Sequence, residues 1–261
     1  MSLTSRLSIV AWFVLLCGAV HAQQFSVRAD RKDSVDAQIA AGRAWAAKAI
    51  TSVTPYERQT AVATALAYFE AVPQFWPKDK DGILRAYVSE GELFVSQSAW
   101  LNLEQVMEKA GPFAQGSRYA SKVSLYLGQA KVRLGKTAEG EQALRDAEQK
   151  AHALGPEAEF APTKELADIY ARQGKTQEAS SRYRALARLL SMDPHNQTWF
   201  FVRSLHLNLG AQAKGEAQRD YRDALDALAA AKAKGVKNDA QAKSQAAIEK
   251  ELADLQKKYG L

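Results

Sequence analysis

The sequence predicts an all-α fold in which antiparallel helix pairs stack into a solenoid. Hydrophobic residues make up 47% of the 261 residues, and prolines number only seven, a composition that favours helix and argues against disorder. Apolar residues recur at three- and four-residue spacing, without the period-two alternation of a strand. Glycine and proline stop signals divide this pattern into helices of roughly 14 to 20 residues, and chain length allows a sizeable core.

Residues 1–22 have the pattern of a secretory signal peptide. A short start carries one positive charge, at Arg6, and an almost wholly apolar run covers 7–20. Val20 and Ala22 provide the small side chains that a signal peptidase requires, so we expect the mature chain to start near residue 23. A retained membrane anchor is the alternative, but the run is shorter than the ~20 residues that a spanning helix needs.

Cys17 lies inside the apolar run, and it is the one cysteine of the chain. Lipidation there is disfavoured because Leu16, rather than a small residue, precedes it. Cleavage after residue 22 would leave a mature chain without disulfides or cysteine metal sites. Such a chain suits the bacterial periplasm, and a lipid-anchored or secreted form is the less favoured alternative.

The charge is mildly basic and well mixed. The whole chain carries +6, and removal of Arg6 with the signal leaves 34 basic and 29 acidic residues, a net charge of +5. No block of lysine or arginine marks a nucleic-acid surface, so no nucleic-acid partner is expected.

Residues 23–80 are expected to form an N-terminal helical pair. Asp33 and Ser34 can cap a first helix that runs to about residue 50. Thr54-Pro55-Tyr56-Glu57 is a capping box with proline at the first helical position, so a second helix should run to about residue 72, before Pro73.

The following region, 81–210, is expected to hold repeated helix pairs, and 211–261 to form a capping hairpin. Gly111-Pro112, Gly155-Pro156 and Asp193-Pro194 interrupt the pattern. The expected helices cover about 81–90, 94–110, 118–134, 138–153, 161–173, 176–191, 197–209, 214–234 and 239–259. The stretch from 211 is rich in alanine and lysine and has a narrow apolar stripe, so a coiled-coil or oligomer contact is the alternative.

Four glycines align as the ends of alternate helices. A glycine there adopts the left-handed conformation without strain, and a small residue in the next helix lets two backbones approach. These structural positions are the glycines Gly91, Gly135, Gly174 and Gly210, and the small residues five positions later, Ser96, Gly140, Ala179 and Gly215. Eight positions before each glycine stands an aliphatic residue: Ile83, Leu127, Leu166 or Val202.

The pattern resembles the tetratricopeptide repeat family. Leu127-Gly128, Gly135, Gly140 and Leu144 carry the resemblance in one unit, and Leu166-Ala167, Tyr170, Gly174, Ala179 and Tyr183 carry it in the next. It covers about residues 81–222 and implies a right-handed solenoid of helix pairs. The glycines are 44, 39 and 36 residues apart, more than the family period of about 34, and Arg219 replaces an apolar residue.

The segments 133–137 and 172–176 read Arg-x-Gly-Lys-Thr, like the end of a phosphate-binding P-loop. The motif needs a glycine five residues earlier and a preceding strand, but Ala130 and Ile169 stand there and helices precede both copies. We therefore interpret both as helix-ending turns. The expected roles are a solvated lysine, Lys136 or Lys175, and a helix-capping threonine, Thr137 or Thr176.

No catalytic or metal constellation stands out in the mature sequence. His152, His195 and His206 lack metal-ligand spacing, and there is no GxSxG elbow. We expect His206 at the edge of a helix seam and His195 in a loop. We expect no metal, no cofactor and no enzymatic activity. A helical enzyme that acts on cell-wall glycan through an unpaired glutamate is the alternative.

Two aromatic clusters lie near helix starts, at 75–76 and 199–201. They are expected to anchor loops and helix seams, and an exposed partner-binding hot spot is the alternative.

The family resemblance implies that the first helix of each pair lines an inner face that binds extended peptides or helices. Matched by offset, the groove residues are Arg85, Val88, Lys122, Gln129, Val132, Arg133, Lys164, Asp168, Arg172, Ser204, Leu207 and Asn208. The mixture is apolar with a basic rim, which suits an acidic peptide or a terminal carboxylate, and a solvated charged face is the alternative.

These observations predict an exported protein-interaction module, a scaffold or assembly factor of the bacterial envelope. The expected partner is a protein or peptide, with no membrane segment left after signal cleavage. An oligomer formed through 211–261 is a further possibility that the sequence leaves open.

Overall fold

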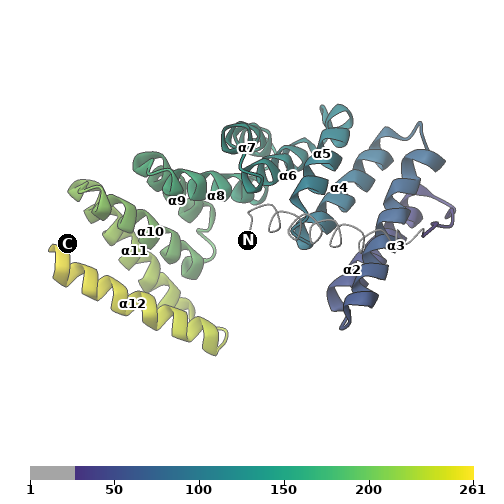
Figure 1. The fold of residues 1–261 in the computed structure, drawn as a ribbon. Helices are drawn as coiled ribbons and strands as arrows, with labels where there is room; N and C mark the ends of the chain where they lie inside the picture. Colours follow the sequence, from purple (N-terminus) through teal and green to yellow (C-terminus); the bar gives the residue numbers. More distant parts are fainter. Residues whose placement is uncertain (1–26) are drawn as a thin grey trace, which may run out of the picture. The chain divides into compact units, whose positions relative to one another are not determined.

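A computed structural model of the protein describes residues 27–261, and all regular structure in this range is helical (Figure 1). The expected signal peptide, 1–22, lies outside the described residues. The helices are α2 (Val35–Thr51), α3 (Pro55–Phe75), α4 (Lys80–Ser96), α5 (Trp100–Ala114), α6 (Ala120–Arg133), α7 (Thr137–His152), α8 (Pro156–Arg172), α9 (Thr176–Leu189), α10 (Pro194–Gly210), α11 (Lys214–Lys234) and α12 (Asp239–Tyr259). They form two compact units that divide between Ser96 and Gln97.

The first unit consists of α2, α3 and α4, which pack on one another. Its predicted caps are confirmed. Ser34 accepts a hydrogen bond from the Ala37 backbone at 3.2 Å, and Thr54 and Glu57 form the reciprocal capping box. The prediction that α3 stops before Pro73 is wrong, since the helix continues to Phe75. A proline so near the end of a helix removes only one backbone hydrogen bond.

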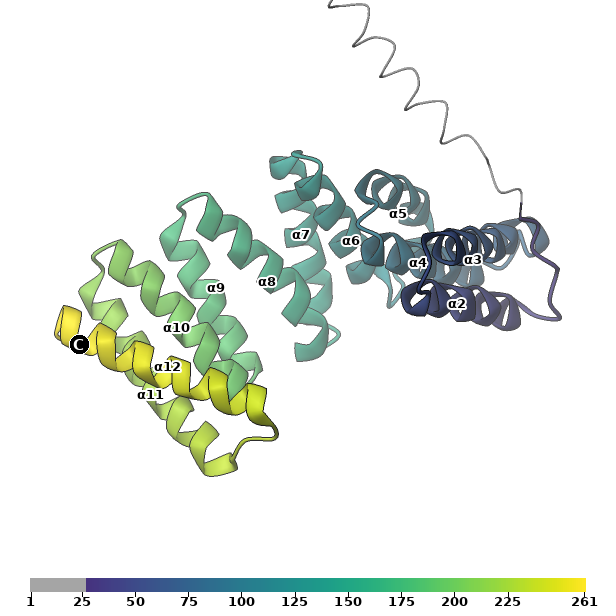
Figure 2. The same cartoon turned by 60° about the horizontal axis from the view of Figure 1, so that its bottom comes forward.

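The second unit contains three consecutive antiparallel pairs, α6–α7, α8–α9 and α10–α11 (Figure 2). Helix α5 packs on α6, and α12 lies against both α10 and α11. A continuous core joins the pairs, with Leu144, Leu166, Tyr170, Tyr183, Leu186 and Leu205 among its fully buried members. Helix α11 is therefore the second helix of the last pair, and α12 alone covers the end. No helix in the described range is long and apolar enough to cross a membrane.

The two Arg-x-Gly-Lys-Thr segments are the turns that end α6 and α8. Gly135 and Gly174 have φ values of +82° and +70°, as a helix-ending glycine requires. In each turn the lysine N–H donates to a carbonyl of the previous helix, at 2.8 Å for Lys136 and 2.9 Å for Lys175. The recurrence identified in the sequence is thus one backbone turn used twice.

The roles predicted for the flanking side chains need correction. Thr137 and Thr176 do not cap α7 and α9, because each is the first helical residue of its helix. The capping position before each is a lysine whose side chain makes no capping hydrogen bond. Lys136 is not merely solvated, since its Nζ lies 2.8 Å from the buried carboxylate of Glu104 in α5. This hydrogen bond raises the pKa of Lys136 and fastens the turn to α5.

The helix-ending role predicted for Gly91 is wrong, and Gly210 is the last residue of α10 but does not take the left-handed conformation. Helix α4 runs through Gly91 to Ser96, and the residue with positive φ is Ser98 at 54°. Helix α10 includes Gly210, and the left-handed position is Gln212 at 57°. A prediction from glycine positions alone therefore puts both left-handed residues at the wrong place. In the structure, side-chain packing holds a non-glycine residue in the left-handed conformation at each turn.

The shift at Gln212 also corrects the register of the last pair. Five and nine residues after Gln212 stand Ala217 and Tyr221, which are buried. They occupy the positions that the sequence assigned to Gly215 and Arg219, both of which are exposed. The last pair therefore obeys the same small-then-large spacing as its neighbours, with Ala217 in the place of Gly140 and Ala179.

Gly140 itself is confirmed as a close-contact position between α6 and α7. A Cβ atom at Gly140 would lie 2.9 Å from the carbonyl oxygen of Gly128 and 2.5 Å from Cγ2 of Val132. Only glycine permits this approach of two helix backbones. Ala179 is completely buried at the equivalent place in α9.

Candidate functional site

The first helices of the three pairs carry a row of accessible polar and aromatic side chains, which we call the inner-helix face. Direct contacts join α6 to α8. Residues three or four positions apart share one side of a helix. The inner-helix face comprises Lys122, Tyr126, Gln129 and Arg133 on α6, Lys164, Glu165, Asp168 and Arg172 on α8, and Trp199, Arg203 and His206 on α10.

Arg133 and Arg172, which the sequence placed at the edges of one groove, lie at one end of this face. They line a cavity of about 400 Å³ together with the predicted Val132 and with Thr137, Ile169 and Gln173. Both arginines are exposed, and neither forms an ion pair within residues 27–261. The Arg133 guanidinium lies 5.6 Å from the ring centre of Trp100. Two guanidinium groups without carboxylate partners are suited to bind an anionic group.

The middle of the face is held by hydrogen bonds between helices. Gln129 Nε2 donates to Glu165 Oε1 at 3.1 Å, which links α6 to α8. Asp168 accepts from the Tyr183 hydroxyl at 2.5 Å and from Lys164 at 2.9 Å. Burial acts to raise the pKa of Asp168, but these hydrogen bonds outweigh it and lower the pKa. Asp168 is therefore a fixed negative charge, and Lys164 is already paired.

The pKa of Tyr183 is shifted in the opposite direction, upward. Burial, then the hydrogen bond to Asp168, raises the pKa of its hydroxyl. The phenol therefore remains a neutral donor that ties α9 to α8. The predicted groove residues Lys164 and Asp168 thus support the face, whereas Arg133 and Arg172 are free to bind.

The prediction that Ser204 and Asn208 line the groove is wrong, because both are buried beneath α11. The offset was counted from Gly210 instead of Gln212. A two-residue shift turns a helical side chain by about 200°, from the accessible side to the seam. The third residue predicted on α10, Leu207, is half-buried against the core.

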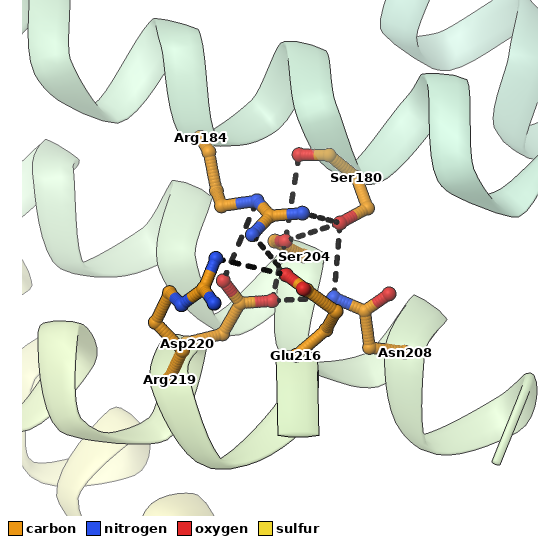
Figure 3. A network of polar contacts seen from close by, with 7 residues as sticks. All are labelled: Ser180, Arg184, Ser204, Asn208, Glu216, Arg219 and Asp220. Carbon is orange, nitrogen blue, oxygen red and sulfur yellow. Dashed lines mark hydrogen bonds and ion pairs between the residues drawn. The ribbon is translucent and has the colours of Figure 1, made fainter. Parts of the chain in front are cut away.

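Ser204 and Asn208 belong instead to a buried polar network between α9, α10 and α11 (Figure 3). Both donate to Asp220 Oδ2 at 2.6 Å, and Asp220 is 0% exposed. Asn208 also donates to the Ser180 hydroxyl at 2.9 Å. The Nε atom of Arg184 lies 3.7 Å from Asp220 Oδ1. This network stabilises the last pair, and its Asp220 carboxylate is closed to a ligand.

Residues that the sequence analysis missed take the places of Ser204 and Asn208. The guanidinium carbon of Arg203 lies 4.5 Å from the Trp199 ring centre and 5.2 Å from that of Tyr183. Trp199 is 38% exposed and beside a cavity of about 420 Å³, which it shares with Phe160, His195 and Ile248. The aromatic cluster at 199–201 was the sequence feature that pointed to this place. Its last two members are buried in the core, and its first member, Trp199, is accessible.

Two predicted groove residues, Arg85 and Val88, lie on α4 in the first unit. Val88 is 1% exposed and is part of that unit's core. Arg85 forms ion pairs with Asp36 and Asp81. Within this unit neither side chain presents a free binding group of the kind found at Arg133.

His206 and His195, the two histidines for which the sequence predicts a place, lie elsewhere in the structure. His206 is exposed and hydrogen-bonded to Glu251 of α12 at 2.5 Å, and His195 lies in the first turn of α10 rather than in a loop. His152 pairs with Glu159 at 2.7 Å. Across residues 27–261, no group of three or more histidine, cysteine, aspartate or glutamate side chains is placed to hold a metal ion.

Comparison with known proteins supports the fold. No protein-family model matches the chain, and no curated protein sequence matches it. Among solved structures, BtubC (BKLC) from P. vanneervenii is similar with a TM-score of 0.51 and 14% identity, over 80% of this chain and 95% of that one. MamA is similar with a TM-score of 0.50 and 15% identity, over 68% of this chain and 94% of that one.

A second MamA structure gives a TM-score of 0.50 and 13% identity, over 72% of this chain and 91% of that one. At these identities the likeness shows the fold. The chain is an all-helical solenoid of consecutive packed helix pairs.

Proposed function

We propose that the protein is an exported, tetratricopeptide-like interaction module whose inner-helix face binds a segment of a partner protein. The observation that carries the proposal is the cavity between α6 and α8, where Arg133 and Arg172 stand without ion-pair partners. The fixed carboxylate of Asp168 and the exposed Trp199 lie on the next helices of the same face. A partner segment with an acidic group at one end and an aromatic or basic group further along fits this order.

A charge reversal at the cavity tests the proposal. The mature chain is used as bait in an extract of the cell envelope, and captured proteins are quantified by mass spectrometry. In Arg133→Glu/Arg172→Glu, recovery of the main partner should fall at least about 10-fold, because each lost charge-assisted contact costs about 1.5–3 kcal/mol.

The matched control is Lys243→Glu/Lys250→Glu, which makes the same change of charge at exposed positions of α12. It should recover the partner as well as the unchanged chain. Equal recovery by both variants would end the proposal for this face.

Export from the cytoplasm is the second part of the proposal, and it is supported by the apolar run at 7–20 with small residues before position 23. We place the mature protein in the bacterial periplasm as a scaffold or assembly factor. Cell fractionation tests this: the full chain should appear in the periplasm in a shortened form, and a chain without residues 2–22 should stay in the cytoplasm. A full-length membrane-bound product would contradict cleavage.

The glycan-enzyme alternative requires two close carboxylates in a cleft. Glu216 and Asp220 stand one turn apart on α11, and both approach Arg184. Burial raises the pKa of Asp220, and the hydrogen bond from Arg184 lowers that of Glu216. Asp220 is nonetheless fully buried by Ser204 and Asn208, so this pair better fits a structural role than contact with a substrate.

A further inference from the structure

The second helices of the pairs also present a cavity, on a surface that the proposed function does not use. Between α9 and α11 lies an open groove of about 550 Å³, which we call the α9–α11 groove. Its charged lining is Arg184, Arg188, Arg219 and Glu216, and Thr176 and Ser181 add hydroxyl groups. Its volume is within the range of ordinary ligand sites.

Positive charge exceeds negative charge in this groove. Glu216 is the one carboxylate in the lining, and it forms ion pairs with two arginines. Its Oε2 lies 2.5 Å from Nη1 of Arg184 and 3.4 Å from Nη1 of Arg219. Arg188 is exposed and forms no ion pair within residues 27–261. The carboxylate of Asp220 below is fully buried. Arg188 and the exposed Arg219 are therefore available to an anionic ligand.

One of the three arginines in the groove is held in place by its neighbours. Arg184 is held by Glu216 and by a 3.3 Å hydrogen bond to Ser180, and its side chain is only 15% exposed (Figure 3). Arg188 stands one turn further along α9, and Arg219 lines the same groove from α11. From Thr176 to Arg188 the helix rises about 18 Å, the length of about five residues of extended chain. The length suits a polypeptide segment better than a single small ion.

Positive charge continues beyond the groove on the other side of α9. Arg188 also lines a neighbouring cavity of about 570 Å³, together with Arg145 and Arg182. Arg182 is paired with Glu148 at 3.1 Å, and Arg145 with Glu141 at 2.6 Å. Arg188 thus stands between two cavities as the unpaired cation of this surface.

We propose that the α9–α11 groove binds an acidic, extended segment of a partner protein, whose carboxylates pair with Arg188 and Arg219. Arginine binds carboxylates through two parallel N–H···O bonds, so two such groups in one groove select spaced acidic residues. The groove is lined by other side chains than the inner-helix face. One chain could therefore hold two partner segments at once, and this inference stands independently of the proposed function.

The test is direct binding of a fluorescently labelled hexaglutamate peptide with blocked ends, followed by fluorescence anisotropy at low salt. Hexaglutamine serves as the neutral peptide. Arg188→Glu/Arg219→Gln should weaken hexaglutamate binding at least about 10-fold, since two charge-assisted contacts are lost. Lys243→Glu/Lys250→Gln carries the same change of charge at exposed positions of α12, outside both surfaces, and should change affinity less than about twofold.

Three results would overturn the inference. Equal weakening by the two variants would mean that net charge alone attracts the peptide. Hexaglutamine binding as tightly as hexaglutamate would remove the role of the arginines. Displacement of hexaglutamate by inorganic phosphate, a DNA oligonucleotide or anionic vesicles at equal charge concentration would show a general anion site. Circular dichroism checks folding, and Arg188→Gln/Arg219→Gln replaces the charge-reversed variant if that variant is unfolded, with the same loss expected.

Discussion

Replacing Asp220 with alanine is expected to lower the free energy of unfolding by about 3 kcal/mol. The carboxylate is fully buried and accepts hydrogen bonds from Ser204 and Asn208 at 2.6 Å each. Its removal leaves the Ser204 and Asn208 donors without this acceptor in a buried seam, and it removes the negative charge beside Arg184. Urea denaturation followed by circular dichroism measures the loss, and hydrogen exchange should place it in α9, α10 and α11.

Asp226→Ala on the same helix is the control, because Asp226 is exposed and its loss should change stability by less than about 0.5 kcal/mol. If the two variants lose the same amount, the network of Figure 3 does not stabilise the last pair.

The stability difference between the unchanged chain and Asp220→Ala depends on pH with a definite sign. Burial raises the pKa of Asp220 above 3.8, against the hydrogen bonds from Ser204 and Asn208. The native state therefore holds this proton more tightly than the unfolded chain. Asp220 contributes most to stability below the unfolded pKa, and its contribution declines as pH rises through the native pKa. The difference between the unchanged chain and Asp220→Ala should be at least as large at pH 4 as at pH 7.

Gly140→Ala is expected to cost about 3 kcal/mol, the upper end of ordinary overpacking. The added methyl group would lie 2.9 Å from the Gly128 carbonyl oxygen and 2.5 Å from Val132 Cγ2. Because two of its three nearest atoms belong to the backbone, a side-chain rotation cannot relieve the contact, and α6 and α7 must separate. The midpoint of thermal or urea unfolding measures the loss.

Gly215→Ala is the matched control, and its expected effect has the opposite sign. Gly215 is exposed in the first turn of α11, with no atom within 4 Å of an added Cβ. Alanine should raise the free energy of unfolding by about 0.5 kcal/mol through its better helix propensity. The sequence assigned these two glycines the same role, so equal effects would contradict the corrected register.

The same mutations bear on both binding surfaces. Val132, which the Gly140 methyl would displace, lines the cavity of Arg133 and Arg172. Arg184, which Asp220 and Glu216 hold in place, lines the α9–α11 groove. A loss of packing at either position should therefore weaken binding at the nearby surface more than at the other.

The sequence by itself determined the features that depend on local interactions. Apolar spacing located each helix of residues 27–261, and the Thr54 capping box and the glycine turns at 135 and 174 were found where they were expected. A cap or a glycine turn depends on residues only a few positions apart, so its chemistry can be read from the printed chain. The repeat register also gave Arg133 and Arg172 equivalent positions in their pairs, and the structure shows that both line one cavity.

The tertiary structure alone decided the register of the last pair and the side chains that remain accessible there. The left-handed residue is Gln212 although a glycine stands two positions earlier, because the burial of Ala217 and Tyr221 against α10 sets the turn. Those two residues of shift exchange the buried Ser204 for the exposed His206. The α9–α11 groove likewise brings together side chains from separate helices, and local sequence does not specify such a packing arrangement.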